Sequence, residues 1–133
     1  MDLYPTILAL VGVENPAGHA VDGVDLAKQF AGKHNPSRPD VFLMHFPHGP
    51  HRSSYFTSYR SGDWKVVYDY SPEGKGNPKH ELYNLKADPF ENDNLATKNP
   101  EKLGQLIAAM VKQLKAEGAL YPVDAGGKEI LPR

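Results

Sequence analysis

The sequence contains no cysteine. This absence excludes disulfide bonds, thiolate ligands for a metal ion and a cysteine nucleophile in this chain. It also leaves the redox compartment undetermined, because neither disulfides nor metal-binding thiols are there to indicate one. Any chemistry must come from other side chains.

Long hydrophobic runs and an excess of one charge are also missing. The longest apolar run, residues 7–11, is too short to cross a bilayer, and the first residues lack the basic-then-apolar order of a signal peptide. The 15 basic and 16 acidic side chains nearly cancel, and no run of Lys or Arg forms a stripe. We therefore expect no membrane partner, no targeting signal in this chain and no nucleic-acid partner, and the compartment stays unknown.

The clearest pattern that is present lies in residues 54–70, SYFTSYRSGDWKVVYDY. Large side chains fall at every second position of its second half, namely Trp64, Val66, Tyr68 and Tyr70. This alternation is typical of a strand with one buried face. Because aromatic and β-branched residues also fill the first half, the segment predicts a β-hairpin joined at Ser61-Gly62.

Three further segments have strand or short-helix patterns. Residues 3–11 are almost entirely apolar and predict a helix covered on most sides, with Asp2 as its cap and Gly12 as its end. Residues 40–46, DVFLMHF, form a continuous apolar run that predicts a central strand buried on both faces. In residues 80–85, apolar and polar side chains alternate enough to predict another strand. A short helix is expected at residues 26–30.

The strongest helix signal follows Asn99. Asn99 is placed to cap, Pro100 suits the first helical position, and Gly118 closes the helix. Apolar residues then repeat every three or four positions, namely Leu103, Leu106, Ile107, Met110, Val111 and Leu114. Such a stripe predicts a helix packed on one face of a sheet.

These elements predict one α+β domain over residues 1–133. Its sheet has about four antiparallel strands packed against the long C-terminal helix, with the short apolar helix at the N-terminus. Residues 40–118 would hold the sheet and the helix. Residues 1–39 would form a helix and a joining loop, and residues 119–133 a surface tail.

The candidate binding residues are His45, His48, His51 and Arg52. Three imidazoles could ligate zinc, and His with Arg could hold an anion or a sugar. A spacing of three residues brings imidazoles together only on a helix, which the intervening prolines forbid. An anion or sugar contact and an ordered surface loop without function both remain open. The acidic residues Asp88, Glu91 and Asp93 lack the spacing of a calcium loop, so we interpret them as a solvated turn.

No catalytic centre emerges from the spacing of residues. The sequence has no glycine-rich phosphate loop before a helix, no serine in a nucleophile elbow and no carboxylate pair spaced for acid and base roles.

An ordered series of motifs adds a resemblance. DLYPTILALVGV, DGVDL, a strand ending in HFPH, YRSGDWKVVYDY, ELYNLKADPFENDNLA and an amphipathic helix follow one another from Asp2 to about Ala119. The combination R-x-G-D-W-K, E-L-Y-N-L and D-P-x-E-x-x-N-L resembles the C-terminal part of the sulfatase family, arylsulfatase-like enzymes of the alkaline-phosphatase-type fold. In that family this part is a four-stranded antiparallel sheet packed against a helix.

The resemblance also implies what this chain lacks. Family members hydrolyse sulfate esters with a formylglycine, made from Cys or Ser in a C-x-P-S-R motif, and with a calcium ion. These groups lie mostly in a large N-terminal domain that is not in this chain. Pro36-Ser37-Arg38 reproduces P-S-R, but His34 stands where Cys or Ser is required, so we interpret the match as coincidence. No catalytic residue, metal ligand or cofactor is carried over, and the chain alone is expected to be inactive.

Three hypotheses follow from the residues and the resemblance together. The first is the C-terminal part of a sulfatase, in which His45, His48, His51 and Arg52 help to select a sulfated sugar and the partner is the missing N-terminal catalytic domain. The second is an independent module that binds a sugar or an anion through the same loop. The third is an assembly element whose exposed apolar surface pairs with another copy of the chain. Members of the family are often periplasmic, secreted or lysosomal.

Overall fold

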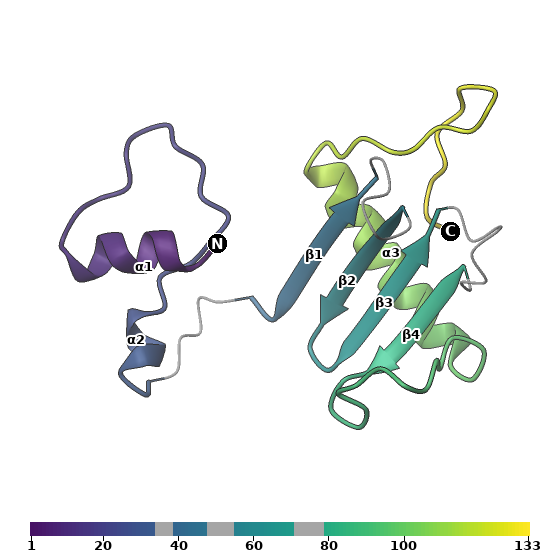
Figure 1. Ribbon diagram of the computed structural model, residues 1–133, viewed down its shortest axis with the longest axis horizontal. Coiled ribbons are helices and arrows are strands. Elements are labelled where there is room, and N and C mark those ends of the chain that lie inside the picture. The colour runs from purple at the N-terminus through teal and green to yellow at the C-terminus, as the bar shows by residue number, and fades with distance from the viewer. Residues whose placement is uncertain (34–38, 48–54, 71–78) are drawn as a thin grey trace. The chain divides into compact units, whose positions relative to one another are not determined.

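The computed structural model describes residues 1–33, 39–47, 55–70 and 79–133. The chain divides into two compact units, Met1–Pro39 and Asp40–Arg133. The elements are α1 (Leu3–Leu10), α2 (Ala27–Phe30), β1 (Val41–Phe46), β2 (Phe56–Ser61), β3 (Trp64–Asp69), β4 (His80–Asn84) and α3 (Pro100–Ala116) (Figure 1). This α+β architecture confirms the predicted fold class.

The first unit is held together by the side chain of Thr6 in α1 and that of Asp2, which precedes the helix. The Thr6 hydroxyl accepts a hydrogen bond from the Leu26 amide, and an Asp2 carboxylate oxygen accepts one from the Val24 amide. The predicted capping role of Asp2 is therefore wrong, since its side chain makes no cap hydrogen bond to the helix. The predicted end of the helix is confirmed, because Gly12 has a φ of 72°, which favours glycine.

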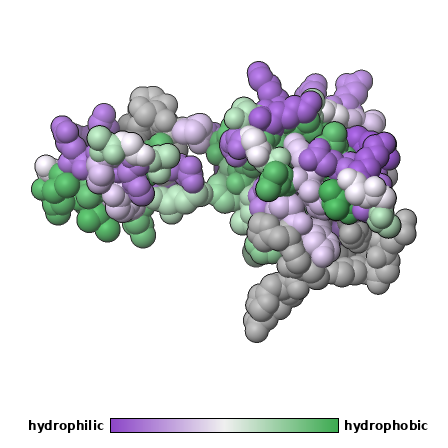
Figure 2. Space-filling view, turned by 90° about the horizontal axis from the view of Figure 1, so that it is seen from above, coloured by the Kyte–Doolittle hydropathy of each residue, from purple (hydrophilic) through white to green (hydrophobic). Residues whose placement is uncertain are grey.

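Helix α1 is exposed rather than covered. Leu3, Ile7 and Leu10 are each more than half exposed, and Thr6 is the helix's buried residue. Hydrophobic residues gather on one side of this unit in Figure 2. The described residues therefore leave most of α1 uncovered, and its burial against polypeptide outside this chain stays a prediction.

The second unit is built on one antiparallel sheet in the order β1-β2-β3-β4. The predicted hairpin is confirmed, with its turn one residue later than expected. Ser61 pairs with Trp64, so Gly62 and Asp63 form the two-residue turn. Gly62 has a φ of 58°, which suits the first central position of a type II′ turn.

The core lies between one face of the sheet and α3, which passes behind the strands in Figure 1. The predicted stripe is confirmed, since Leu106, Ile107, Met110 and Leu114 are buried. They pack with Tyr59, Val66, Tyr68, Tyr70 and Leu82. Asn99 precedes α3 as predicted, but its side chain makes no capping hydrogen bond.

Strand β1 differs from its prediction. It is an edge strand, and Phe42 and Met44 are 41% and 43% exposed. The expectation of a central strand buried on both faces is therefore wrong. A continuous apolar run shows that both faces favour burial, but it does not reveal whether a neighbour lies on each side.

The last residues are fastened to the sheet by long-range hydrogen bonds. The Tyr68 hydroxyl donates to the Leu131 carbonyl at 3.3 Å, and the His80 Nε2 lies 2.7 Å from the Arg133 carbonyl. Tyr121 and Ile130 also pack against the core. Across the described ranges, no helix has the length and apolar character that crossing a membrane requires.

Candidate functional site

Of the four predicted binding residues, the structure describes His45 alone. His48, His51 and Arg52 lie outside the described residues. His45 belongs to β1, in which it pairs with Thr57 of β2. Its alternation with Met44 places it on the sheet face that carries the core, next to the end of the strand.

Both ring nitrogens of His45 have partners. Nδ1 lies 2.7 Å from the Thr57 hydroxyl, and Nε2 lies 2.7 Å from the Leu120 carbonyl. A carbonyl can only accept, so Nε2 carries a proton and donates it. In the neutral ring, Nδ1 then accepts from Thr57, whose oxygen accepts from the Tyr70 hydroxyl at 2.8 Å. This His45–Thr57–Tyr70 chain ties β1, β2 and the segment after α3 together.

Tyr70 is the buried end of that chain. It is 5% exposed, and burial raises the pKa of its hydroxyl to about 12, with a smaller opposing effect from the Thr57 hydrogen bond. The hydroxyl therefore keeps its proton at neutral pH and acts as a hydrogen-bond donor. The sequence pattern indicated Thr57 and Tyr70 only as hairpin residues, and it contained no signal of their polar contact.

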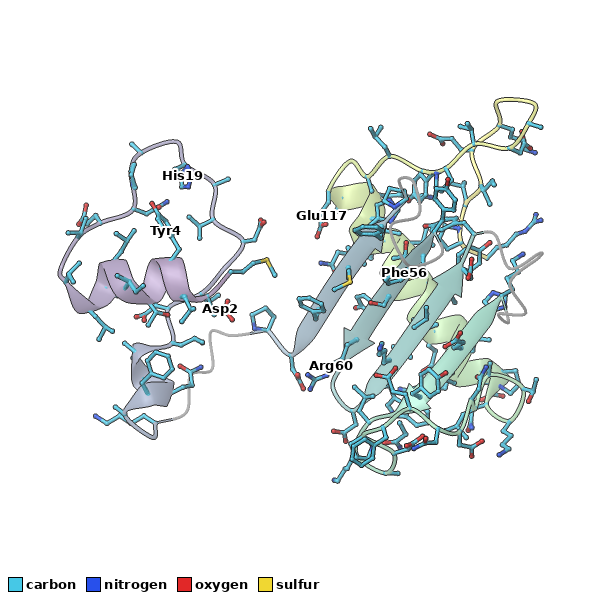
Figure 3. All side chains as sticks on the ribbon, viewed as in Figure 1. Asp2, Tyr4, His19, Phe56, Arg60 and Glu117 are labelled. Carbon is cyan, nitrogen blue, oxygen red and sulfur yellow. The ribbon has the colours of Figure 1, made fainter. Side chains whose placement is uncertain are left out.

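The R-x-G-D-W-K motif contributes two charged residues that lie on the face opposite the core. Arg60 donates to the Gly62 carbonyl at 2.9 Å and pairs with Asp40 at 3.2 Å. Lys65 lies 2.8 and 2.7 Å from the two carboxylate oxygens of Glu91. Figure 3 shows Phe56 and Arg60 toward opposite ends of β2. These charges fasten the hairpin to its flanking segments.

The D-P-x-E-x-x-N-L motif forms the turn after β4. The Asp88 carboxylate accepts hydrogen bonds from the amides of Asn92 and Asp93, which lower the pKa of Asp88. Asn94 accepts from the Leu82 amide at 3.1 Å and donates to the His80 carbonyl at 3.1 Å. Asn94 therefore extends the hydrogen bonding of β4 with a side chain.

A calcium site is not supported by this turn. Glu91 is paired with Lys65, Asp93 is paired with Lys98, and Asp88 binds backbone amides. Within the described ranges, no three His, Asp or Glu side chains come together as metal ligands. The acidic residues thus have partners that shape the turn.

We call the sheet face opposite α3 the open face. It carries a groove with a volume of about 340 Å³. It is lined by Phe42, Met44, Phe56, Ser58, Arg60, Lys65, Val67, Leu85 and Glu91. The centre is apolar, and the Lys65–Glu91 pair lies on its border. Sequence reasoning missed this surface, although the continuous apolar run of β1 was its signal.

A scan against protein-family models gave no match. Searches of whole proteins did find relatives. The chain is 32% identical over 117 residues to an uncharacterized sulfatase of Schizosaccharomyces pombe, covering 80% of this chain and 19% of that protein. It is 26% identical over 131 residues to arylsulfatase K of Rattus norvegicus, covering 91% of this chain and 22% of that protein.

Solved structures share the fold. The protein BT4656, solved in complex with its substrate D-glucosamine-2-N,6-O-disulfate, is 24% identical with a TM-score of 0.66, over 86% of this chain and 23% of that one. The phosphonate monoester hydrolase of Silicibacter pomeroyi is 19% identical with a TM-score of 0.60, over 99% of this chain and 29% of that one.

The chain thus shares its fold with part of longer chains of known structure. The chain is a homologue of sulfatases, at their C-terminal region, and covers only a fragment of that family. It spans about a fifth of the length of the curated relatives it matches. The predicted resemblance is confirmed, while the binding roles of His45, His48, His51 and Arg52 stay predictions.

Proposed function

We propose that this chain is the non-catalytic C-terminal part of a sulfuric ester hydrolase of the arylsulfatase type. One observation carries the proposal: charged and amide side chains of the motifs R-x-G-D-W-K and D-P-x-E-x-x-N-L are engaged in holding the fold. Arg60 and Lys65 bind the sheet to its neighbours, and Asn94 binds the turn to β4. Such residues position a scaffold and leave the chemistry to other groups.

The nucleophile and the metal ion of this hydrolase are proposed to lie on polypeptide outside these 133 residues. The resemblance implies a formylglycine and a calcium ion in the N-terminal domain of the family. The acidic turn here does not fit calcium, because its carboxylates already bind amides and ammonium groups. The relatives have about four-fifths of their length in which to carry both groups.

A second role is substrate selection by the residues that follow β1. Imidazole and guanidinium groups of His48, His51 and Arg52 can donate hydrogen bonds to hydroxyl or sulfate oxygens. His45 has both ring nitrogens engaged, so its part in this role is to anchor the strand that precedes these residues in the chain. The similar protein solved with a sulfated glucosamine supports a sulfated sugar as the ligand.

The substrate-selecting role can be tested on the isolated chain by NMR titration with D-glucosamine-2-N,6-O-disulfate. Without the catalytic part we expect weak binding, with a Kd on the order of 1–10 mM, equivalent to about 3–4 kcal/mol. Arg52→Ala should weaken binding at least threefold, because a charge-assisted contact to sulfate is lost. Shifts should concentrate at residues 48–52.

The matched control is Arg60→Ala, which removes an arginine that already pairs with Asp40. It should leave the affinity unchanged. Absence of shifts up to about 20 mM ligand would remove the substrate-selecting role, since even millimolar binding is then excluded. Equal weakening by both substitutions would reduce the binding to nonspecific charge attraction.

A further inference from the structure

The open face carries apolar side chains at positions where a solvated sheet face usually carries polar ones. Antiparallel sheets that face water on one side usually alternate apolar and polar residues. On β1, however, the solvent side carries Phe42 and Met44, which are 41% and 43% exposed. Phe46 follows on the same side of the strand. Its ring stacks on that of Phe56, with 6.1 Å between the two ring centroids.

The groove crosses the neighbouring strands along a row of two apolar residues with a serine between them. Met44 is paired with Ser58, and Ser58 is paired with Val67, so these three form one row across β1, β2 and β3. The groove runs along this row and is lined at its β4 side by Leu85 and Glu91. An apolar centre with charges at its border is the usual anatomy of a protein interface.

Residues of the second unit cover the other sheet face but leave this one open. Helix α3 packs against the face of Val66 and Leu82, and in Figure 1 none of the drawn helices of this unit crosses the face turned to the viewer. Among the described residues of this unit, only the turn that carries Glu91 reaches over the open face, where Glu91 binds Lys65. In the half built from β1 and β2, Phe42, Met44 and Arg60 are exposed, whereas Ser58 is buried.

We infer that the open face is the surface on which the catalytic part of the sulfatase polypeptide docks. This inference rests on the proposed function and names the face through which the scaffold acts. The relatives carry the matched region as about a fifth of one longer chain. A covalently linked partner has an effective concentration in the millimolar range, so it occupies an apolar face before a second copy at micromolar concentration does.

The absence of cysteine makes this inference accessible to labelling. Met44→Cys places a thiol in the centre of the open face. Leu120→Cys is the matched control, because Leu120 is 80% exposed and lies outside the groove lining. Maleimide labelling of both variants would be followed by peptide mass spectrometry, first in the isolated chain and then in rat arylsulfatase K whose matching region is replaced by this chain.

In the isolated chain we expect both thiols to react at rates within about threefold, since both sites are solvent-accessible. In the chimera the Met44→Cys thiol should react at least tenfold more slowly, while the Leu120→Cys thiol is unchanged. Equal labelling of Met44→Cys in the folded chimera would overturn the inference. So would a dimer of the isolated chain, seen by sedimentation and dissociated by Met44→Asp, because a second copy would then be the occupant.

Two readouts separate this inference from the proposed function. Hydrolysis of an aryl sulfate by the chimera reports on the function, and thiol protection reports on the surface. An active chimera with an unprotected thiol contradicts the surface alone. A protected thiol without hydrolysis contradicts the proposed function alone. If the chimera does not fold, the sedimentation result for the isolated chain decides between the catalytic part and a second copy.

Discussion

The Lys65 ammonium group binds both carboxylate oxygens of Glu91, at 2.8 and 2.7 Å. The two residues lie 26 positions apart in the sequence and belong to two different motifs. Lys65 closes R-x-G-D-W-K on β3, and Glu91 is the acidic residue of D-P-x-E-x-x-N-L in the turn after β4. The co-occurrence of the two motifs therefore has a physical reason, because each supplies one half of an ion pair.

A double-mutant cycle with Lys65→Met and Glu91→Gln measures the strength of this pair. Both side chains are about a quarter to a third exposed, so we expect a coupling of about 1 kcal/mol in urea unfolding, near the upper end for surface pairs. The Lys98–Asp93 pair is more than 60% exposed and serves as the control. Its coupling should stay below about 0.5 kcal/mol. Equal coupling energies would show that the partial burial of the Lys65–Glu91 pair does not strengthen it.

Asn94 is predicted to be the most sensitive residue of the turn. Its Oδ1 accepts from the amides of Leu82 and Ala96, and its Nδ2 donates to the His80 carbonyl. Asn94→Ala leaves these backbone groups without their partner and should lower the free energy of unfolding by about 2–3 kcal/mol. Asn94→Asp keeps the acceptor and should lower it by less. Thermal unfolding followed by circular dichroism distinguishes the two, and identical midpoints would contradict the assigned contacts.

Alkaline pH should weaken the fold through Tyr70. Burial raises the pKa of Tyr70 to about 12, above the value of 10.0 expected in the unfolded chain. The folded state thus holds this proton more tightly, and its contribution is fully present below pH 10 and lost as pH rises toward 12. The free energy of unfolding should fall by on the order of 2 kcal/mol across that window.

The variant Tyr70→Phe isolates this contribution from those of other tyrosines. It removes the hydrogen bond to Thr57, so stability at pH 7 should fall by about 1 kcal/mol. Between pH 10 and 12, however, its stability should decline less steeply than that of the wild type. Parallel pH profiles for the two proteins would argue against a tightly held proton on Tyr70.

The sequence predicted those features that depend on local pattern. The alternation around Val66 and the apolar stripe around Met110 suffice for the hairpin and for α3, because strand and helix periods are local properties. The partners of His45 and Lys65 could not be predicted. Leu120 lies 75 residues from His45, and such pairings depend on how the chain folds back.

The error at β1 has a different origin. A run such as VFLMHF indicates that both faces favour apolar surroundings, but it contains no information on which neighbours are present. Phe42 and Met44 are exposed because no described residue of the second unit covers them. The mismatch between sequence and structure is therefore itself the argument for a docking partner.

The division of labour between this chain and a separate catalytic part is tested most directly by the turnover of 4-methylumbelliferyl sulfate. The purified 133-residue chain would be assayed with calcium at concentrations up to about 100 μM, against buffer alone. The account predicts no hydrolysis above the buffer rate, since the described residues act as scaffold. Hydrolysis proportional to chain concentration and abolished by a single substitution in this chain would contradict it.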